Sequence, residues 1–141
     1  MFKHLLVPYD GSEHALRALS HAKQLVLSLA EAPKLTVLHV NPDISINEPP
    51  VGVELDEQIA REGEEMLIPV REALAGLPAG SCSTIVRHGD PGKIICKSAE
   101  QEQADLIVMG TRGLGLVSEL LIGSVSHYVI QHASCPVTIV K

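Results

Sequence analysis

Residues 105–126 read DLIVMGTRGLGLVSELLIGSVS, and this stretch decides the fold expected for the rest of the chain. The apolar run at residues 106–109 has the length and composition of a buried parallel strand. Gly110 and Gly113 interrupt this run, and an amphipathic helical pattern begins after Gly123-Ser124. Backbone N–H groups at a helix N-terminus are unpaired and carry partial positive charge, and glycine lets an anion approach them. The stretch therefore predicts a phosphate-binding strand, loop and helix start.

The spacing of the glycines excludes two common phosphate-binding motifs. There is no G-x-x-x-x-G-K-[ST], because no lysine adjoins Gly123-Ser124, and there is no G-x-G-x-x-G, because Gly113-x-Gly115 lacks a third glycine at the required distance. The pattern that remains is Gly110-x2-Gly113-x9-Gly123-Ser124.

Apolar runs and helical periodicities alternate along the whole chain. The first strand is almost entirely apolar and should be central in a parallel sheet, whereas the third alternates and should lie nearer an edge. Helices are expected to start at Ser12 and at Asp90-Pro91, and a long one from about residue 54 to 76 contains Pro69, which should kink or split it. The last helix should bury Val125, Val129, Ile130 and Ala133. The expected strands are His4–Pro8, Lys34–Val40, Ser83–Arg87, Leu106–Met109 and Pro136–Val140. This order predicts one α/β domain over residues 1–141, with a parallel sheet and helices on both faces.

Charge and composition argue against several classes of partner. The formal net charge is −6, and no cluster of Lys and Arg is present, so nucleic acid and anionic membranes are not expected as main partners. The three aromatic residues, Phe2, Tyr9 and Tyr128, offer no stacking platform for single-stranded nucleic acid. No apolar run is long enough to cross a membrane and no signal peptide is evident, so a cytoplasmic location is expected. The three cysteines are widely spaced, so a zinc site is not expected.

Three further segments accompany the glycine pattern: LLVPYDGSEHA at residues 5–15, Gly-Asp-Pro at 89–91 and SCPVTIVK at 134–141. Together with the G-x2-G-x9-G-S spacing they resemble the universal stress protein (UspA-like) family, in its ATP-binding branch, over the whole chain. The resemblance implies an open five-stranded, Rossmann-like sheet in the order 3-2-1-4-5. It also implies binding of ATP with Mg²⁺. It further implies a homodimer formed by antiparallel pairing of the last strand, through Val137, Thr138, Ile139 and Val140. Some relatives serve transporters or kinases as regulatory subunits, so a protein partner is a further expectation.

In this sheet order, and equally in the flavodoxin-like order 2-1-3-4-5, ligands bind beyond the carboxyl ends of the strands at the point where the order reverses. In the order 3-2-1-4-5 that point lies between strands one and four, which end at residues 8–10 and 109–110. The unusual residues of the sequence therefore converge on one crevice. The expected contacts are Pro8, Asp10, Val40, Met109, Gly110, Arg112, Gly113, Gly123, Ser124, Val125 and Ser126.

Each end of a bound nucleotide has its own expected partners. Gly123 with the N–H groups and hydroxyls of residues 124–126 would receive the terminal phosphates, and Arg112 would pair with a phosphate. Gly110 and Gly113 would let the backbone approach ribose and phosphate. Asp10 would hold the ribose or a bound Mg²⁺, and Val40 would present its backbone to the edge of the adenine.

Simpler explanations exist for the same residues. Asp10 would also serve to start the turn into the first helix, and Ser124 and Ser126 would serve as helix caps. Arg112 would serve as a solvated loop charge, the glycines as turn residues, and Val40 as part of the core.

Three functions from different classes are consistent with the sequence. The first is an ATP-binding regulator that acts as a homodimer. The second is a slow ATPase or phosphotransferase, which the sequence supports poorly because the expected site holds one carboxylate, one arginine and hydroxyls but no lysine and no evident general base. The third is a dimeric scaffold that binds no nucleotide.

Overall fold

The computed structural model of the chain describes residues 2–41, 64–111 and 122–141. Within these residues five strands form one sheet in the order β3-β2-β1-β4-β5, and every neighbouring pair is parallel. The strands are β1 (His4–Pro8), β2 (Lys34–Asn41), β3 (Cys82–His88), β4 (Leu106–Gly110) and β5 (Val137–Val140). The predicted α/β class and sheet order are confirmed.

The helices between the strands begin where the sequence predicts. They are α1 (Glu13–Ser28), α3 (Pro91–Gln101) and α4 (Ser124–His132), with a further helical segment at residues 64–73. The Ser12 hydroxyl caps α1 by accepting a hydrogen bond from the N–H of Ala15 at 3.1 Å. Asp90 caps α3 in the same way at the N–H of Lys93, and Pro91 lies in the first turn. Both predicted caps are confirmed.

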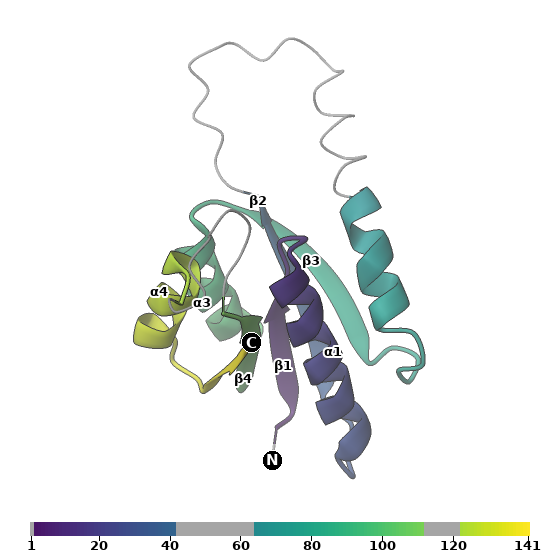
Figure 1. Ribbon diagram of the computed structural model, residues 1–141. Helices are drawn as coiled ribbons and strands as arrows, with labels where there is room; N and C mark the ends of the chain where they lie inside the picture. Colours follow the sequence, from purple (N-terminus) through teal and green to yellow (C-terminus); the bar gives the residue numbers. More distant parts are fainter. Residues whose placement is uncertain (1, 42–63, 112–121) are drawn as a thin grey trace.

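Helices cover both faces of the sheet (Figure 1), because successive side chains of a strand point to opposite faces. Leu5 and Val7 of β1 belong to a cluster with α1 and with the helix at residues 64–73. Leu6, between them, belongs to the second cluster, which contains residues of α3 and α4. β1 is buried at every position, which confirms its central place, and β3 and β5 form the two edges.

The helix that contains Pro69 and the helix α4 differ in part from the prediction. A kink or a split is predicted at Pro69; the segment at residues 64–73 is helical without interruption through this proline, so the split is wrong. The predicted start of this helix, at residues 54–63, lies outside the described residues. In α4, Val129 is buried as predicted, but Ile130 is 44% exposed. The face of this short helix that packs on the sheet includes fewer residues than the apolar pattern of the sequence predicts.

Among the described residues, no helix has the length and apolarity needed to cross a membrane.

Candidate functional site

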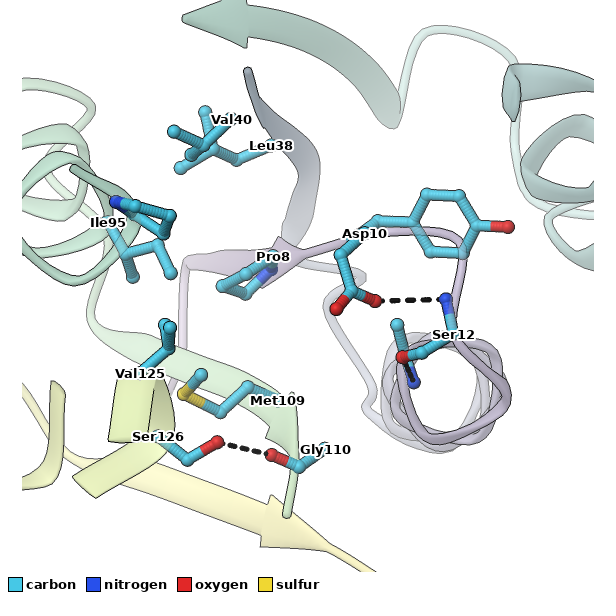
Figure 2. Close-up of a pocket in the computed structure, with 13 residues that line it drawn as sticks. Pro8, Asp10, Ser12, Leu38, Val40, Ile95, Met109, Gly110, Val125 and Ser126 are labelled. Atoms are coloured by element: carbon cyan, nitrogen blue, oxygen red, sulfur yellow. Dashed lines mark hydrogen bonds between the residues drawn. The ribbon is translucent and has the colours of Figure 1, made fainter. Parts of the chain in front are cut away.

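A pocket of about 140 Å³ lies where the carboxyl ends of three strands meet the first turns of three helices (Figure 2). The strands are β1, β2 and β4, and the helices are α1, α3 and α4. The pocket thus lies at the reversal of strand order between β1 and β4, where open α/β sheets bind ligands. Its lining residues are Pro8, Tyr9, Asp10, Ser12, Ala15, Leu38, Val40, Pro91, Ile95, Met109, Gly110, Val125 and Ser126.

The walls of the pocket are mainly apolar. Leu38, Ile95 and Met109 give it flat aliphatic surfaces, and Figure 2 shows them around the end of β1. Polar side chains are fewer and are contributed by Asp10, Ser12 and Ser126. An apolar cavity with a few placed polar groups is typical of a small-molecule binding site.

The first turn of α4 differs from those of α1 and α3. Its N-cap residue is Gly123, which has no side chain to accept a hydrogen bond from the helix. In an α-helix the first N–H groups have no intrahelical partner, and here they belong to Ser124, Val125 and Ser126. Val125 and Ser126 also line the pocket. The positive end of the α4 dipole therefore adjoins the pocket, and its N-cap residue supplies no side-chain cap.

Two hydrogen bonds fix α4 to the end of β4. The N–H of Gly123 donates to the carbonyl oxygen of Thr111 at 2.7 Å, and the hydroxyl of Ser126 donates to the carbonyl oxygen of Gly110 at 2.8 Å. The Ser126 hydroxyl proton is thus engaged within the fold, which leaves its backbone N–H as its contact for an anion. Neither Ser124 nor Ser126 is the N-cap, so the interpretation of these serines as helix caps is wrong.

Gly110 is required by the packing of α1 against β4. A Cβ atom at this position would lie 2.7 Å from Cβ of His14, 2.8 Å from its backbone carbon and 2.9 Å from its carbonyl oxygen. These distances are shorter than any that real Cβ atoms adopt. The glycine therefore has a structural reason that the sequence could not show, separate from any approach of a ligand.

Asp10 starts the turn into α1, as one interpretation of the sequence predicts. Its Oδ1 accepts a hydrogen bond from the N–H of Ser12 at 2.9 Å, which closes the turn into α1. The same half-buried carboxylate lines the pocket, so the turn role and a ligand role are compatible. Burial raises the pKa of the neighbouring Tyr9 phenol, and the negative charge of Asp10 raises it further.

Among the described residues, no group of three or more His, Cys, Asp or Glu side chains is arranged to hold a metal ion. A divalent cation that arrives with a nucleotide needs fewer protein ligands, since Mg²⁺ commonly binds one or two carboxylates together with phosphate oxygens. Asp10 is the carboxylate that lines the pocket.

The backbone of Val40 extends past the end of β1. Leu38 directs its carbonyl oxygen toward β1, where it accepts from the N–H of Tyr9 at 2.8 Å, whereas Asn41 directs its own toward the β3 side. Backbone groups of alternate residues point to the same side, so those of Val40 point to the β1 side. The last residue pair in the register between β1 and β2 is Pro8 with Leu38, which comes two residues before Val40. Val40 therefore presents its N–H and C=O beyond the ladder, at the wall of the pocket.

The structure brings most of the predicted site residues together. Those that line the pocket are Pro8, Asp10, Val40, Met109, Gly110, Val125 and Ser126, with Gly123 and Ser124 in the adjoining helix start. Arg112 and Gly113 lie outside the described residues. Sequence reasoning missed the walls formed by Leu38 and Ile95, although both follow the rule that residues near strand ends and helix starts line such crevices.

Comparison with known proteins establishes the family. The profile of the Universal stress protein family matches residues 1–141, and the chain belongs to this family. A universal stress protein of Thermus aquaticus is 38% identical over 143 residues, covering all of both chains. One of Bacillus subtilis is 32% identical over 153 residues, again covering all of both. The solved structure of UspA from Lactobacillus plantarum is 29% identical with a TM-score of 0.84, covering 99% of this chain and 97% of the other.

Two more distant structures of the family contain adenine nucleotides. One is a universal stress protein in complex with cAMP, 24% identical with a TM-score of 0.68 and covering 99% of this chain and 97% of its own. The other is a universal stress protein from Archaeoglobus fulgidus in complex with dAMP, 19% identical with a TM-score of 0.65 and covering 100% and 98%. At these identities the likeness to the present chain is one of fold.

Proposed function

We propose that this universal stress protein binds ATP, together with Mg²⁺, in the pocket between β1 and β4, and acts as a homodimeric regulator. The observation that carries the proposal is the first turn of α4, which has a glycine N-cap and is directed at the pocket. Such a helix start favours an anion, because its N–H groups and its dipole both attract negative charge. The net charge of the chain is −6, so the partial positive charge of this helix start is a local feature that supports the binding of a polyanion in the pocket.

The opposite wall suits the adenine ring. Leu38 and Ile95 offer aliphatic surfaces to its faces, and Val40 offers a backbone N–H and C=O near its edge. Adenine carries an acceptor and a donor side by side on one edge, which complements one N–H and one C=O. The cAMP and dAMP complexes of distant family members support adenine nucleotides as ligands of this fold.

The phosphate wall fits the charged part of the ligand. The N–H groups of residues 124–126 would bind phosphate oxygens, and Asp10 would hold the ribose or the Mg²⁺ ion. Arg112 and Gly113, in the segment that precedes α4 in sequence, remain part of the proposal as phosphate and ribose contacts.

The β5 edge is proposed as the dimer surface. Pro136 and Val140 direct their carbonyl oxygens toward the β4 side, where they accept from Ile107 and Thr111. By alternation, Val137 and Ile139 direct their backbone groups away from the sheet, and these are available to pair with a second copy. A regulatory role follows if ATP binds one assembly or conformation better than another. Catalysis has weaker support, because Asp10, the carboxylate among the described lining residues, accepts a hydrogen bond from the N–H of Ser12 and is proposed to hold the ribose or the Mg²⁺ ion.

The test is the nucleotide content of the purified protein, followed by ATP titration of two matched variants. In Gly123→Asp a side-chain carboxylate would cap α4 and place a negative charge where phosphate is proposed. In Gly123→Asn the same cap would form without the charge. A charge about 6 Å from a phosphate at an effective dielectric constant of about 20 costs about 2.8 kcal/mol, so we expect Gly123→Asp to bind ATP roughly a hundredfold more weakly than Gly123→Asn.

Gly123 is buried, so circular dichroism must first show that both variants fold, and Gly123→Asn controls for the size of the new side chain. Equal affinity of the two variants would place the phosphates elsewhere. A wild-type protein that contains no nucleotide and takes up no added ATP would contradict the proposed function and favour the dimeric scaffold.

A further inference from the structure

Thr111, directly after β4, is held from three directions. Its N–H donates to the carbonyl oxygen of Val140 in β5 at 3.1 Å, and its carbonyl oxygen accepts from the N–H of Gly123 at 2.7 Å. Its hydroxyl Oγ1 lies 3.2 Å from Nδ1 of His14 in α1. One residue thus connects the β5 edge, the start of α4 and the start of α1.

His14 contacts both residues to which α4 is attached. Its Cβ and backbone pack against Gly110, as the clash with an added Cβ shows, and its imidazole forms the hydrogen bond to Thr111. The carbonyl groups of these same two residues receive the hydroxyl of Ser126 and the N–H of Gly123. His14 therefore packs against Gly110 and Thr111, the two residues that hold the first turn of α4 in place, although it does not line the pocket itself.

We propose that His14 is a positioning residue for the phosphate groups of the nucleotide, acting through the hydroxyl of Thr111 on the start of α4. The inference rests on the proposed function and deepens it. When the imidazole holds the Thr111 side chain, the Thr111 carbonyl is kept directed at Gly123, and the N–H groups that follow keep their alignment toward the phosphates. The adenine wall, formed by Leu38, Val40 and Ile95, is built without this hydrogen bond.

This separation of the two walls gives the inference a specific signature. Loss of the hydrogen bond should weaken binding of ATP and leave binding of adenosine, which has no phosphate, nearly unchanged. A role of His14 in stability alone would weaken both ligands equally or neither.

The experiment measures the affinities of ATP and adenosine for variants at the two positions. His14→Ala keeps the Cβ that packs against Gly110 and removes the imidazole. His14→Asn places a polar atom close to the position of Nδ1, whereas His14→Gln places one nearer Nε2. Thr111→Val removes the hydroxyl with little change in shape, and Thr111→Ser retains it.

We expect His14→Ala and Thr111→Val each to weaken ATP binding about fivefold, the loss typical of one hydrogen bond, while adenosine affinity stays within about twofold. His14→Asn and Thr111→Ser should restore most of the ATP affinity, and His14→Gln should not. The double variant His14→Ala/Thr111→Val should be no weaker than His14→Ala alone, because the bond that Thr111→Val removes is already absent in His14→Ala.

The outcomes separate this inference from the function on which it rests. If the wild type binds ATP and the variants bind it equally well, or lose ATP and adenosine in the same proportion, His14 is not a positioning residue and the proposed function stands. If the wild type binds neither ligand, the proposed function fails and the inference fails with it.

Discussion

Replacement of Gly110 by alanine should destabilise the protein through the contact between β4 and α1. The new Cβ would lie 2.7 to 2.9 Å from three atoms of His14, and two of them are backbone atoms of the helix. An ordinary contact begins at 3.4 Å, so α1 and β4 must separate by about 0.5 Å or more. The helix is fixed to the core by Ala18, Leu19 and Ala22, which are completely buried. Overpacking of this kind typically costs about 1–3 kcal/mol.

Urea unfolding followed by circular dichroism measures this cost. The expected loss of unfolding free energy is about 1–3 kcal/mol, with a fall in Tm of about 3 to 10 °C. His14→Ala should not restore the stability of Gly110→Ala, because alanine retains the Cβ and backbone atoms that clash. A Gly110→Ala protein as stable as the wild type would refute the packing described for α1 and β4.

Gly92 provides the matched comparison. A Cβ there would lie 2.7 Å from Cδ1 and 2.9 Å from Cγ of the Tyr128 ring, so its obstacle is a side chain that substitution can remove. Gly92→Ala should be destabilising in the wild-type background and much less so when combined with Tyr128→Ala. If the Gly92 and Gly110 substitutions respond alike to trimming of their neighbours, the distinction between side-chain and backbone clashes is incorrect.

Three other predictions concern the site, the pH dependence and the assembly. Ser126→Ala leaves the buried carbonyl of Gly110 without its hydroxyl donor and should lower the unfolding free energy by about 1–3 kcal/mol, as measured in urea; no loss would mean that the hydrogen bond is unimportant. Burial raises the pKa of the Cys96 and Cys135 thiols above its usual value, so the folded state holds these protons more tightly than the unfolded state. The contribution of the two thiols to stability should be constant below the pKa of a thiol in the unfolded chain, about 8.5, and should be lost as the pH rises through the higher pKa values of the folded state. A double alanine variant at these cysteines should show a smaller fall in stability over that range; an identical fall would contradict the assignment. Ile139→Pro removes a backbone N–H that points away from the sheet and should yield monomers in analytical ultracentrifugation. Ile139→Ala also removes the isoleucine side chain but keeps the N–H, so it should remain dimeric. A dimeric proline variant would exclude the β5 edge as the dimer surface.

The sequence was sufficient for the elements and their places in the sheet where local patterns are strong. β1 is apolar from Leu5 to Pro8 because both of its faces are covered, and β3 alternates because it lies at an edge. The caps Ser12 and Asp90 follow from local hydrogen-bonding rules and are confirmed. The strand order required the family resemblance, since two orders fit the same succession of strands and helices.

The sequence was insufficient where a residue's role depends on a neighbour far along the chain. Gly110 is predicted to let a ligand approach the backbone, and the structure gives its missing side chain a second reason in His14, 96 positions earlier. The serine hydroxyl at position 126 was assigned to phosphate, but it bonds to the Gly110 carbonyl. The contact between His14 and Thr111 spans 97 positions, and no local pattern marks either residue.

Binding of the phosphates at the first turn of α4 is tested most directly by the NMR chemical shifts of backbone amides during titration with ATP and Mg²⁺. We expect the amide signals of Ser124, Val125 and Ser126 to move most strongly, whereas adenosine should move the signal of Val40 and leave these three nearly in place. Saturable binding of ATP without movement of the residue 124–126 amides would mean that the phosphates do not bind at α4.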